Sequence, residues 1–329
     1  MTTIVAQIAP QRSTQYTELV TDLAPFELLL SNIGDRMTDE LEFVGLGTQT
    51  YLKFDMDETP DESTLRSLAN MAMTDAYFQY FDGIGDETGP FLKPLDVDTT
   101  TYLPPDLITT RRYRGKTNEL FTQFMCNIAR YSSDFQDTPW NKLTLLDPLC
   151  GGSTTLFVGL VLGADVAGVE NDRKVVEGTV GFVKQYMREA KIAAKFREDK
   201  LKGVGKRWFI TLDQSLRCSI GRGETADVQQ FITGLKRPQL IVTDLPYGIQ
   251  HGESWGEVLL DALPAWAEVL ADGGAMAFSW NATRFSRVEM VDLVEAISDF
   301  RVLNDPPYNQ LAHRVDRVIK ERDVIVTRR

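Results

Sequence analysis

The chain has 329 residues, of which 43% are hydrophobic and 25% are charged, a composition typical of a globular protein. No apolar run reaches the length of a membrane span, and residues 1–7 lack the basic start and apolar core of a signal peptide. The three cysteines cannot all pair, and with two histidines they show no metal-ligand spacing. We therefore expect no zinc site and favour a reduced, cytoplasmic location.

The formal net charge of −12 disfavours nucleic-acid binding unless the charge is segregated along the chain. Segregation is visible in the sequence, because residues 184–207 are rich in lysine and arginine and the C-terminal residues 314–329 are also basic. Each run has two readings, an RNA-binding track or a solvated helix face.

Residues 1–110 have the pattern of a small α+β domain. Residues 41–44 and 50–54 predict two strands joined by a glycine-containing turn, and residues 61–73 predict a helix with an apolar stripe. Loop composition from residue 83 to 105 marks a boundary. We therefore predict two domains, residues 1–110 and residues 111–329.

A basic segment, residues 111–118, precedes a helical pattern over residues 120–128. Its Gly-Lys-Thr triplet suggests a phosphate loop, but Thr110 stands where that motif needs its first glycine. No buried strand leads into the triplet either. The sequence therefore does not predict nucleotide hydrolysis.

The stretch after residue 142 predicts a strand, a tight turn and a helix. Residues 143–146 are an apolar run of the kind found in strands buried on both faces. The strand ends at Asp147 and Pro148, because proline lacks the amide needed to continue the ladder. Two glycines follow at 151–152, and the hydroxyls of residues 153–155 are expected to cap the next helix. This is the first unit of a nucleotide-binding α/β fold.

The turn is a poor match to a dinucleotide site. Asp147 and Leu149 occupy positions where the G-x-G-x-x-G fingerprint needs glycine, and a carboxylate at the turn repels pyrophosphate. The turn suits a ligand with an ammonium group and no phosphate. S-adenosylmethionine is such a ligand, and it also carries a sulfonium. The alternative is an ordinary turn without a ligand.

Two later acids follow predicted buried strands. Residues 166–169 precede Glu170, which lies about twenty residues after the glycine turn, where this fold hydrogen-bonds a ribose. Residues 240–243 precede Asp244, which is followed by a proline, a tyrosine and a glycine. The remaining predicted strands are residues 208–211, 275–279, 300–303 and 323–327.

Residues 147–154 resemble the first motif of Rossmann-like methyltransferases that act on amino groups of nucleobases. The Asp-Leu-Pro-Tyr-Gly sequence at 244–248 resembles their D/N-P-P-Y/F signature, in the form found in the tRNA and other RNA guanine-N2 enzymes. The resemblance covers residues 111–329. It implies an α/β fold with a seven-stranded Rossmann-like methyltransferase sheet and a terminal antiparallel hairpin, beside the small N-terminal domain.

The resemblance also implies a cofactor site for S-adenosylmethionine. In this arrangement a helix before the first strand lies over the cofactor. Lys116, Thr117 and Asn118 at the start of that helix are expected to meet the cofactor's carboxylate, and plain helix capping is the competing reading for them. Asp213, two residues after the third predicted strand, is expected to meet the adenine amine, with Asp199, Asp227 and Gln214 as rivals. The predicted cofactor-binding residues are Asp147, Pro148, Cys150, Gly151, Gly152, Glu170, Asp213, Thr117 and Asn118.

The predicted catalytic residues are Asp244, Leu245, Pro246 and Tyr247. An exocyclic base amine is a weak nucleophile, and the Asp244 carboxylate and the Leu245 carbonyl accept its two N–H groups. The proline stiffens the turn, and the tyrosine ring stacks on a flipped base. The rest of the activation barrier to methyl transfer is lowered mainly by the in-line placement of the amine against the sulfonium.

Residues 305–308, Asp-Pro-Pro-Tyr, match the signature more literally than residues 244–247 do. They lie between the last two predicted strands, however, whereas the catalytic turn should follow the strand beside the first one. We therefore predict that they form a loop of the terminal hairpin.

The predicted function is methylation of an exocyclic amine, with guanine N2 in tRNA or other RNA as the expected target and RNA as the expected partner. The alternatives are adenine N6 in DNA or RNA and a small-molecule amine. A non-catalytic binding module that keeps the fold is a further alternative.

Overall fold

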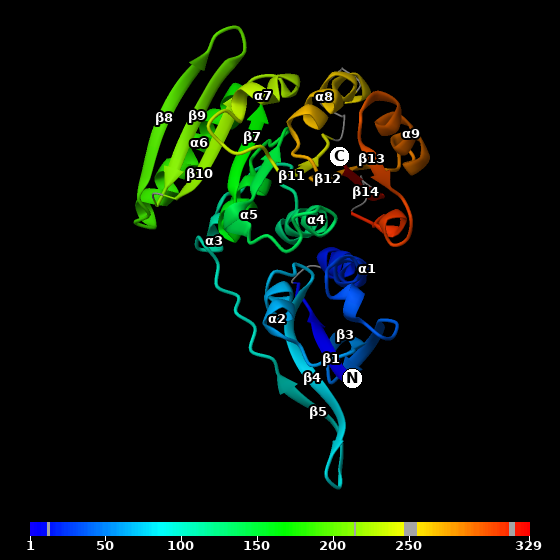
Figure 1. The fold of residues 1–329 in the computed structure, drawn as a ribbon. Coiled ribbons are helices and arrows are strands. Elements are labelled where there is room, and N and C mark those ends of the chain that lie inside the picture. The colour runs from blue at the N-terminus through cyan, green and yellow to red at the C-terminus, as the bar shows by residue number, and fades with distance from the viewer. Residues whose placement is uncertain (12–13, 214, 247–254, 316–319) are drawn as a thin grey trace. The chain divides into compact units, whose positions relative to one another are not determined.

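The computed structural model describes residues 1–11, 14–213, 215–246, 255–315 and 320–329. The chain divides into two compact units (Figure 1). The first comprises Met1–Thr100 and His313–Lys320, and the second comprises Thr101–Ala312 and Glu321–Arg329. The first division falls ten residues before the boundary that we placed at residue 110.

The smaller unit is an antiparallel sheet with the strand order β2-β3-β1-β4-β5. Its strands are β1 (Thr2–Ile8), β2 (Glu42–Leu46), β3 (Gln49–Met56), β4 (Thr74–Ile84) and β5 (Glu87–Pro94), and its helices are α1 (Thr14–Leu30) and α2 (Glu62–Ala69). The two predicted strands correspond to β2 and β3. Helix α2 begins at the N-cap Asp61, whose side chain accepts a hydrogen bond from the Thr64 amide at 2.8 Å.

The larger unit is built on a nine-stranded sheet with the order β13-β14-β12-β11-β6-β7-β10-β9-β8. Its five parallel strands are β6 (Thr144–Asp147), β7 (Asp165–Glu170), β10 (Leu216–Arg222), β11 (Leu240–Asp244) and β12 (Ala275–Asn281). The antiparallel strands are β8 (Ala194–Leu201), β9 (Gly205–Leu212), β13 (Arg301–Leu303) and β14 (Arg322–Arg328).

The other parallel strands lie on both sides of β6 in the sheet. The chain runs from β6 outward to β7 and β10, and then returns to the other side of β6 for β11 and β12. Such a switch in strand order opens a crevice at the carboxyl ends of the strands, which is where α/β sheets bind ligands. Strand β14 pairs antiparallel with both β12 and β13. The predicted Rossmann-like methyltransferase fold with its terminal hairpin is therefore confirmed.

The predicted count of seven strands and the predicted third strand were wrong. Residues 208–211 belong to β9, which runs antiparallel to β10. The strand that lies parallel beside β7 is β10, so β8 and β9 form an additional hairpin beyond it (Figure 1). The apolar run in β9 is more strand-like than the mixed sequence of β10, which explains the wrong assignment.

Helices cover both faces of the larger sheet. On one face α4 (Glu119–Tyr131) packs on α5 (Thr154–Leu162), and α5 contacts α6 (Arg173–Glu189) through their phenylalanine rings. Helix α3 (Asp106–Thr110) lies against α5. On the other face α7 (Val228–Phe231), α8 (Trp255–Val269) and α9 (Arg287–Ile297) surround a core that contains Phe231, Trp266 and Met290. Within the described ranges, no helix combines the length and apolar character needed to span a bilayer.

Candidate active site

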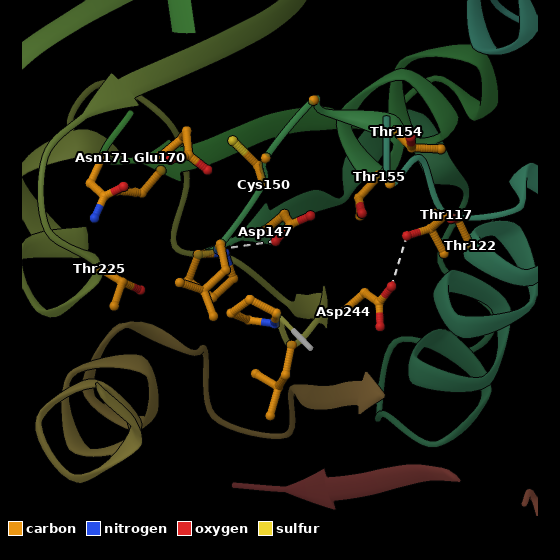
Figure 2. Close-up of a pocket in the computed structure, with 18 of the residues that line it drawn as sticks. Thr117, Thr122, Asp147, Cys150, Thr154, Thr155, Glu170, Asn171, Thr225 and Asp244 are labelled. Carbon is orange, nitrogen blue, oxygen red and sulfur yellow. Dashed lines mark hydrogen bonds between the residues drawn. The ribbon is translucent and has the colours of Figure 1, made fainter. Parts of the chain in front are cut away.

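A cavity of about 780 Å³ lies at the carboxyl ends of β6, β7, β10 and β11, at the point where the strand order switches. Its volume is within the range of small-molecule and cofactor pockets. Figure 2 shows Glu170, Asn171 and Thr225 toward one end, Asp244 and Thr117 toward the other, and Asp147 between them. The cavity thus brings together the acids at the ends of three different strands, which are Asp147, Glu170 and Asp244.

Asp147 is the last residue of β6 and is only 3% exposed. Its carboxylate accepts a hydrogen bond from the Leu149 amide at 3.1 Å (Figure 2). Burial raises the pKa of Asp147 to about 6, and the nearby charge of Asp244 acts in the same direction, while hydrogen bonds from Thr155 and Leu149 oppose it. Above that pH the cavity holds a buried carboxylate, which favours a cationic ligand.

The glycine turn after β6 packs closely against the segment that precedes α4. Gly151 has a φ of +45°, in the left-handed region that favours glycine. A Cβ atom on Gly152 would lie 2.1 Å from the Tyr113 ring, so no side chain fits there. The Tyr113 hydroxyl is 2.5 Å from Thr154 Oγ1, and Arg111 donates to the Gly152 carbonyl at 2.7 Å. The segment before α4 therefore closes over the turn.

The predicted cap of α5 was wrong for Ser153. This residue occupies the N-cap position, but its φ is +73° and its side chain makes no capping hydrogen bond. Its hydroxyl donates instead to the sulfur of Cys150 at 3.7 Å. The Cys150 amide donates to the Val169 carbonyl at 2.9 Å, which ties the turn to β7. Pro148 and Cys150 both line the cavity.

Glu170 ends β7 and lines the cavity together with Asn171. One of its carboxylate oxygens accepts a hydrogen bond from the Asp172 amide at 2.7 Å. Burial raises the pKa of Glu170, and the backbone hydrogen bonds that it accepts lower it. Asp172 caps α6 by accepting hydrogen bonds from the amides of Lys174 and Val175. Glu170 is thus the acid in this segment that faces the cavity.

Asp244 ends β11 and is held by groups from three other elements. Thr117 Oγ1 donates to its Oδ2 at 2.7 Å (Figure 2), and Ser279 Oγ from β12 donates to its Oδ1 at 2.5 Å. Arg322 from β14 is 6% exposed, and its Nη2 lies 3.8 Å from Asp244 Oδ2. The Arg322 guanidinium also lies 4.8 Å from the centre of the Phe121 ring. These contacts fix the direction of the carboxylate.

The rest of the predicted catalytic turn is only partly described. Leu245 and Pro246 line the cavity, and the Leu245 amide donates to the Ser279 carbonyl at 2.9 Å. This bond fixes the peptide that follows Asp244. Tyr247 lies outside the described residues.

The three residues predicted at the start of α4 have different placements. Thr117 lines the cavity and contacts Asp244. Asn118 is the N-cap of α4 and its Oδ1 accepts a hydrogen bond from the Phe121 amide at 3.0 Å. Helix capping, the competing reading, therefore accounts for Asn118. Lys116 donates to the Ile108 carbonyl at 2.7 Å.

Asp213 lies away from the cavity. It follows β9, which runs antiparallel, so it sits at the opposite edge of the sheet, where its amide donates to the Ala193 carbonyl. The residues that follow β10 at the cavity are Gly223, Glu224 and Thr225. The hydroxyl of Thr225 accepts a hydrogen bond from Trp266 Nε1 at 3.0 Å. Two glycines at 221 and 223, followed by an acid, are the sequence signal that would have indicated this turn.

The more literal signature, residues 305–308, lies between β13 and β14, as predicted. The Tyr308 hydroxyl is 3.0 Å from Ser132 Oγ, and the Tyr308 carbonyl accepts a hydrogen bond from Arg287. None of residues 305–308 lines the cavity. Strand β11, which ends at Asp244, pairs with β6, in agreement with the expected strand order.

No protein-family description and no curated protein matches the chain. Several solved structures are similar to it. TrmN from Thermus thermophilus shares 11% identity over 100% of both chains with a TM-score of 0.49. The rRNA methyltransferase aviRa from Streptomyces viridochromogenes shares 15% identity over 68% of this chain and 91% of its own, with a TM-score of 0.42.

An rRNA methylase from Streptococcus thermophilus shares 9% identity over 58% of this chain and 92% of its own, with a TM-score of 0.34. At such identities and TM-scores, the fold assignment rests on the strand order of the larger sheet.

Proposed function

We propose that the chain is an S-adenosylmethionine-dependent methyltransferase that methylates an exocyclic amino group of a nucleobase in RNA, with guanine N2 as the expected target. The observation that carries the proposal is that Asp147 and Asp244, at the ends of the neighbouring strands β6 and β11, line one cavity. Asp147 suits a cationic methyl donor, and Asp244 suits an acceptor amine.

The residues of the cavity fit this cofactor. Glu170 offers a carboxylate to the two hydroxyls of a ribose, and the buried Asp147 offers a negative charge to an ammonium or sulfonium group. Gly151 leaves the backbone accessible, since a Cβ atom there would meet nothing within 4 Å, and the carboxylates disfavour a phosphate-bearing ligand. S-adenosylmethionine supplies an electrophilic methyl group when it is bound. Glu224 and Thr225 are the proposed contacts at the adenine end.

Asp244 and Leu245 are proposed to hold the acceptor amine. Because Thr117 and Ser279 each donate to one oxygen of Asp244, the carboxylate is fixed but keeps lone pairs for a substrate N–H. The Leu245 carbonyl accepts the second N–H. Two such contacts aim the nitrogen lone pair and leave a carboxylate oxygen to take the proton released by methylation. Orientation of this kind supplies much of the rate increase in a bimolecular transfer.

The test is incubation of the protein with methyl-labelled S-adenosylmethionine and separate pools of RNA, duplex DNA and small-molecule extract. We expect label in RNA, and digestion of the RNA to nucleosides to place it on an exocyclic amine. Asp244→Ala is expected to abolish labelling, whereas Asp305→Ala, in the Asp-Pro-Pro-Tyr loop outside the cavity, serves as a matched control that keeps activity. Label confined to DNA or small molecules would contradict the RNA assignment, and no label in any pool would contradict the enzyme itself.

A further inference from the structure

The net negative charge of the chain comes from residues 1–100. Of the 47 acidic and 35 basic residues in the sequence, residues 1–100 hold 18 and 5, which leaves 29 acidic and 30 basic residues in residues 101–329. The unit that holds the cavity excludes residues 313–320 and so has 28 acidic and 27 basic residues, which makes it almost neutral as a whole. A polyanion approaching it meets no general repulsion, and a local excess of lysine and arginine then determines where the polyanion binds.

Such an excess lies on the β8–β9 hairpin, residues 194–212, which contains six basic and two acidic residues. Strand β8 runs in the same direction as β10, so the turn after Leu201 lies at the carboxyl edge of the sheet, which is also the edge of the cavity. Leu201 and Val204 pack against the core on the α7 side. A Cβ atom on Gly223, which lines the cavity, would lie 3.1 Å from the Val204 carbonyl. The tip of the hairpin is therefore anchored beside the cavity.

The basic residues of the hairpin fall into two groups. Arg197 and Arg207 share Asp199, and Lys206 pairs with Glu198 at 2.7 Å. The other three lysines are exposed and form no salt bridge with any residue in the described ranges; they are Lys195, Lys200 and Lys202. Lys200 and Lys202 are at the tip, at the carboxyl edge, whereas Lys195 is at the amino edge.

A second basic group flanks the cavity in the segment before α4. Arg112 and Arg114 are exposed and alternate with Tyr113 and Gly115, which line the cavity. Cationic side chains that point to solvent beside the cavity are positioned for the phosphates of a substrate whose base enters it.

The spacing of the strands sets the size of the ligand. Four strand intervals separate β11, which carries Asp244, from β9, and at about 4.8 Å per interval this is about 19 Å. An acceptor that contacts both Asp244 and the hairpin tip must extend over that length, which excludes a single nucleotide and a small amine.

We propose that Lys200 and Lys202, together with Arg112 and Arg114, bind the phosphate backbone of the RNA substrate while its target base occupies the cavity. This inference rests on the proposed function and assigns the substrate's docking surface. The competing explanation is that lysines on an edge strand serve only to prevent sheet-to-sheet association. That explanation predicts no change in RNA binding when the lysines are removed.

The test compares two double variants that each remove two exposed lysines. Lys200→Ala/Lys202→Ala alters the hairpin tip, and Lys142→Ala/Lys195→Ala alters the amino edge of the same sheet. Bulk tRNA is titrated at several salt concentrations, and S-adenosylmethionine affinity is measured for each protein. At 0.1 M salt, two lost phosphate contacts are expected to weaken tRNA binding about 25- to 60-fold and to reduce the salt slope by about 1.4 to 1.8.

We expect the amino-edge variant to bind tRNA like the wild type, and both variants to bind S-adenosylmethionine normally. In turnover, the tip variant should raise KM for tRNA and keep kcat. Equal tRNA binding by the two variants, with methylation intact, would overturn the docking surface and leave the proposed function standing. A wild type that binds no S-adenosylmethionine would instead defeat the proposed function. Tighter binding of duplex DNA than of tRNA would overturn the choice of RNA.

Discussion

Asp147→Asn is expected to make the protein more stable while it removes the charge needed for the cofactor. Burial raises the pKa of Asp147 from its ordinary value of 3.8 to about 6. A tenfold change in proton affinity is worth about 1.36 kcal/mol, so this difference changes the free energy of unfolding by about 3 kcal/mol. Because the folded state holds the proton more tightly than the unfolded state, the free energy of unfolding falls as the pH rises from about 4 to about 6. Above that range the loss is complete.

Asparagine keeps the shape of the side chain and an oxygen for the Leu149 amide, but it does not ionise. Asp147→Asn is expected to be more stable than the wild type at pH 8. We expect this difference in the free energy of unfolding to be about 3 kcal/mol larger at pH 8 than at pH 4. Thermal unfolding measures this as a rise of roughly 6–12 °C at pH 8 that disappears near pH 4. Asp305→Asn, which changes an acid away from the cavity, is the control. A difference from the wild type that does not depend on pH would refute the assignment of a buried, proton-binding Asp147.

Three further changes test the cavity. Gly152→Ala should clash with Tyr113 and weaken S-adenosylmethionine binding by about 1–3 kcal/mol, and adding Tyr113→Ala should restore part of the loss; calorimetric affinities that are unchanged in the single variant would count against this geometry. Ser279→Ala removes a hydrogen bond to Asp244 and should lower kcat about tenfold at unchanged cofactor affinity, as measured by labelled-methyl transfer; an unaltered kcat would show that the contact is dispensable. Glu170→Gln should raise the Kd for S-adenosylmethionine about 10- to 100-fold and preserve kcat at saturation, so equal titration curves would exclude Glu170 from the ribose site.

The central strands and their acids could be predicted because the signals are local. Residues 143–146 and 240–243 are short apolar runs, as expected of strands covered by helices on both faces, and each ends at an acid. The fold then places the ends of parallel strands along one edge. Asp147, Glu170 and Asp244 therefore lie at one cavity, although nothing in the sequence gives their separations.

The rest of the site depends on pairings between distant segments. Ser279 reaches Asp244 because β12 pairs in register with β11, with these two residues opposite each other. Arg322 reaches it from β14, two strands away in the sheet. No local pattern marks either residue.

The β8–β9 hairpin was missed for a different reason. Residues 195–202 contain only two apolar residues, Phe196 and Leu201, among six charged ones, a pattern that also fits a solvated helix face. The assignment of Asp213 failed with it, because the strand before Asp213 runs in the opposite direction.

The most direct measurement is a calorimetric titration of the wild-type protein with S-adenosylmethionine at pH 7 and pH 5. We predict one site per chain at pH 7, with affinity reduced roughly tenfold at pH 5, because a carboxyl with a pKa of about 6 is about 90% ionised at the first pH and about 10% at the second. Asp147→Asn should bind weakly at both. The absence of binding at pH 7, or tighter binding at pH 5, would contradict the proposal that this cavity holds a cationic methyl donor.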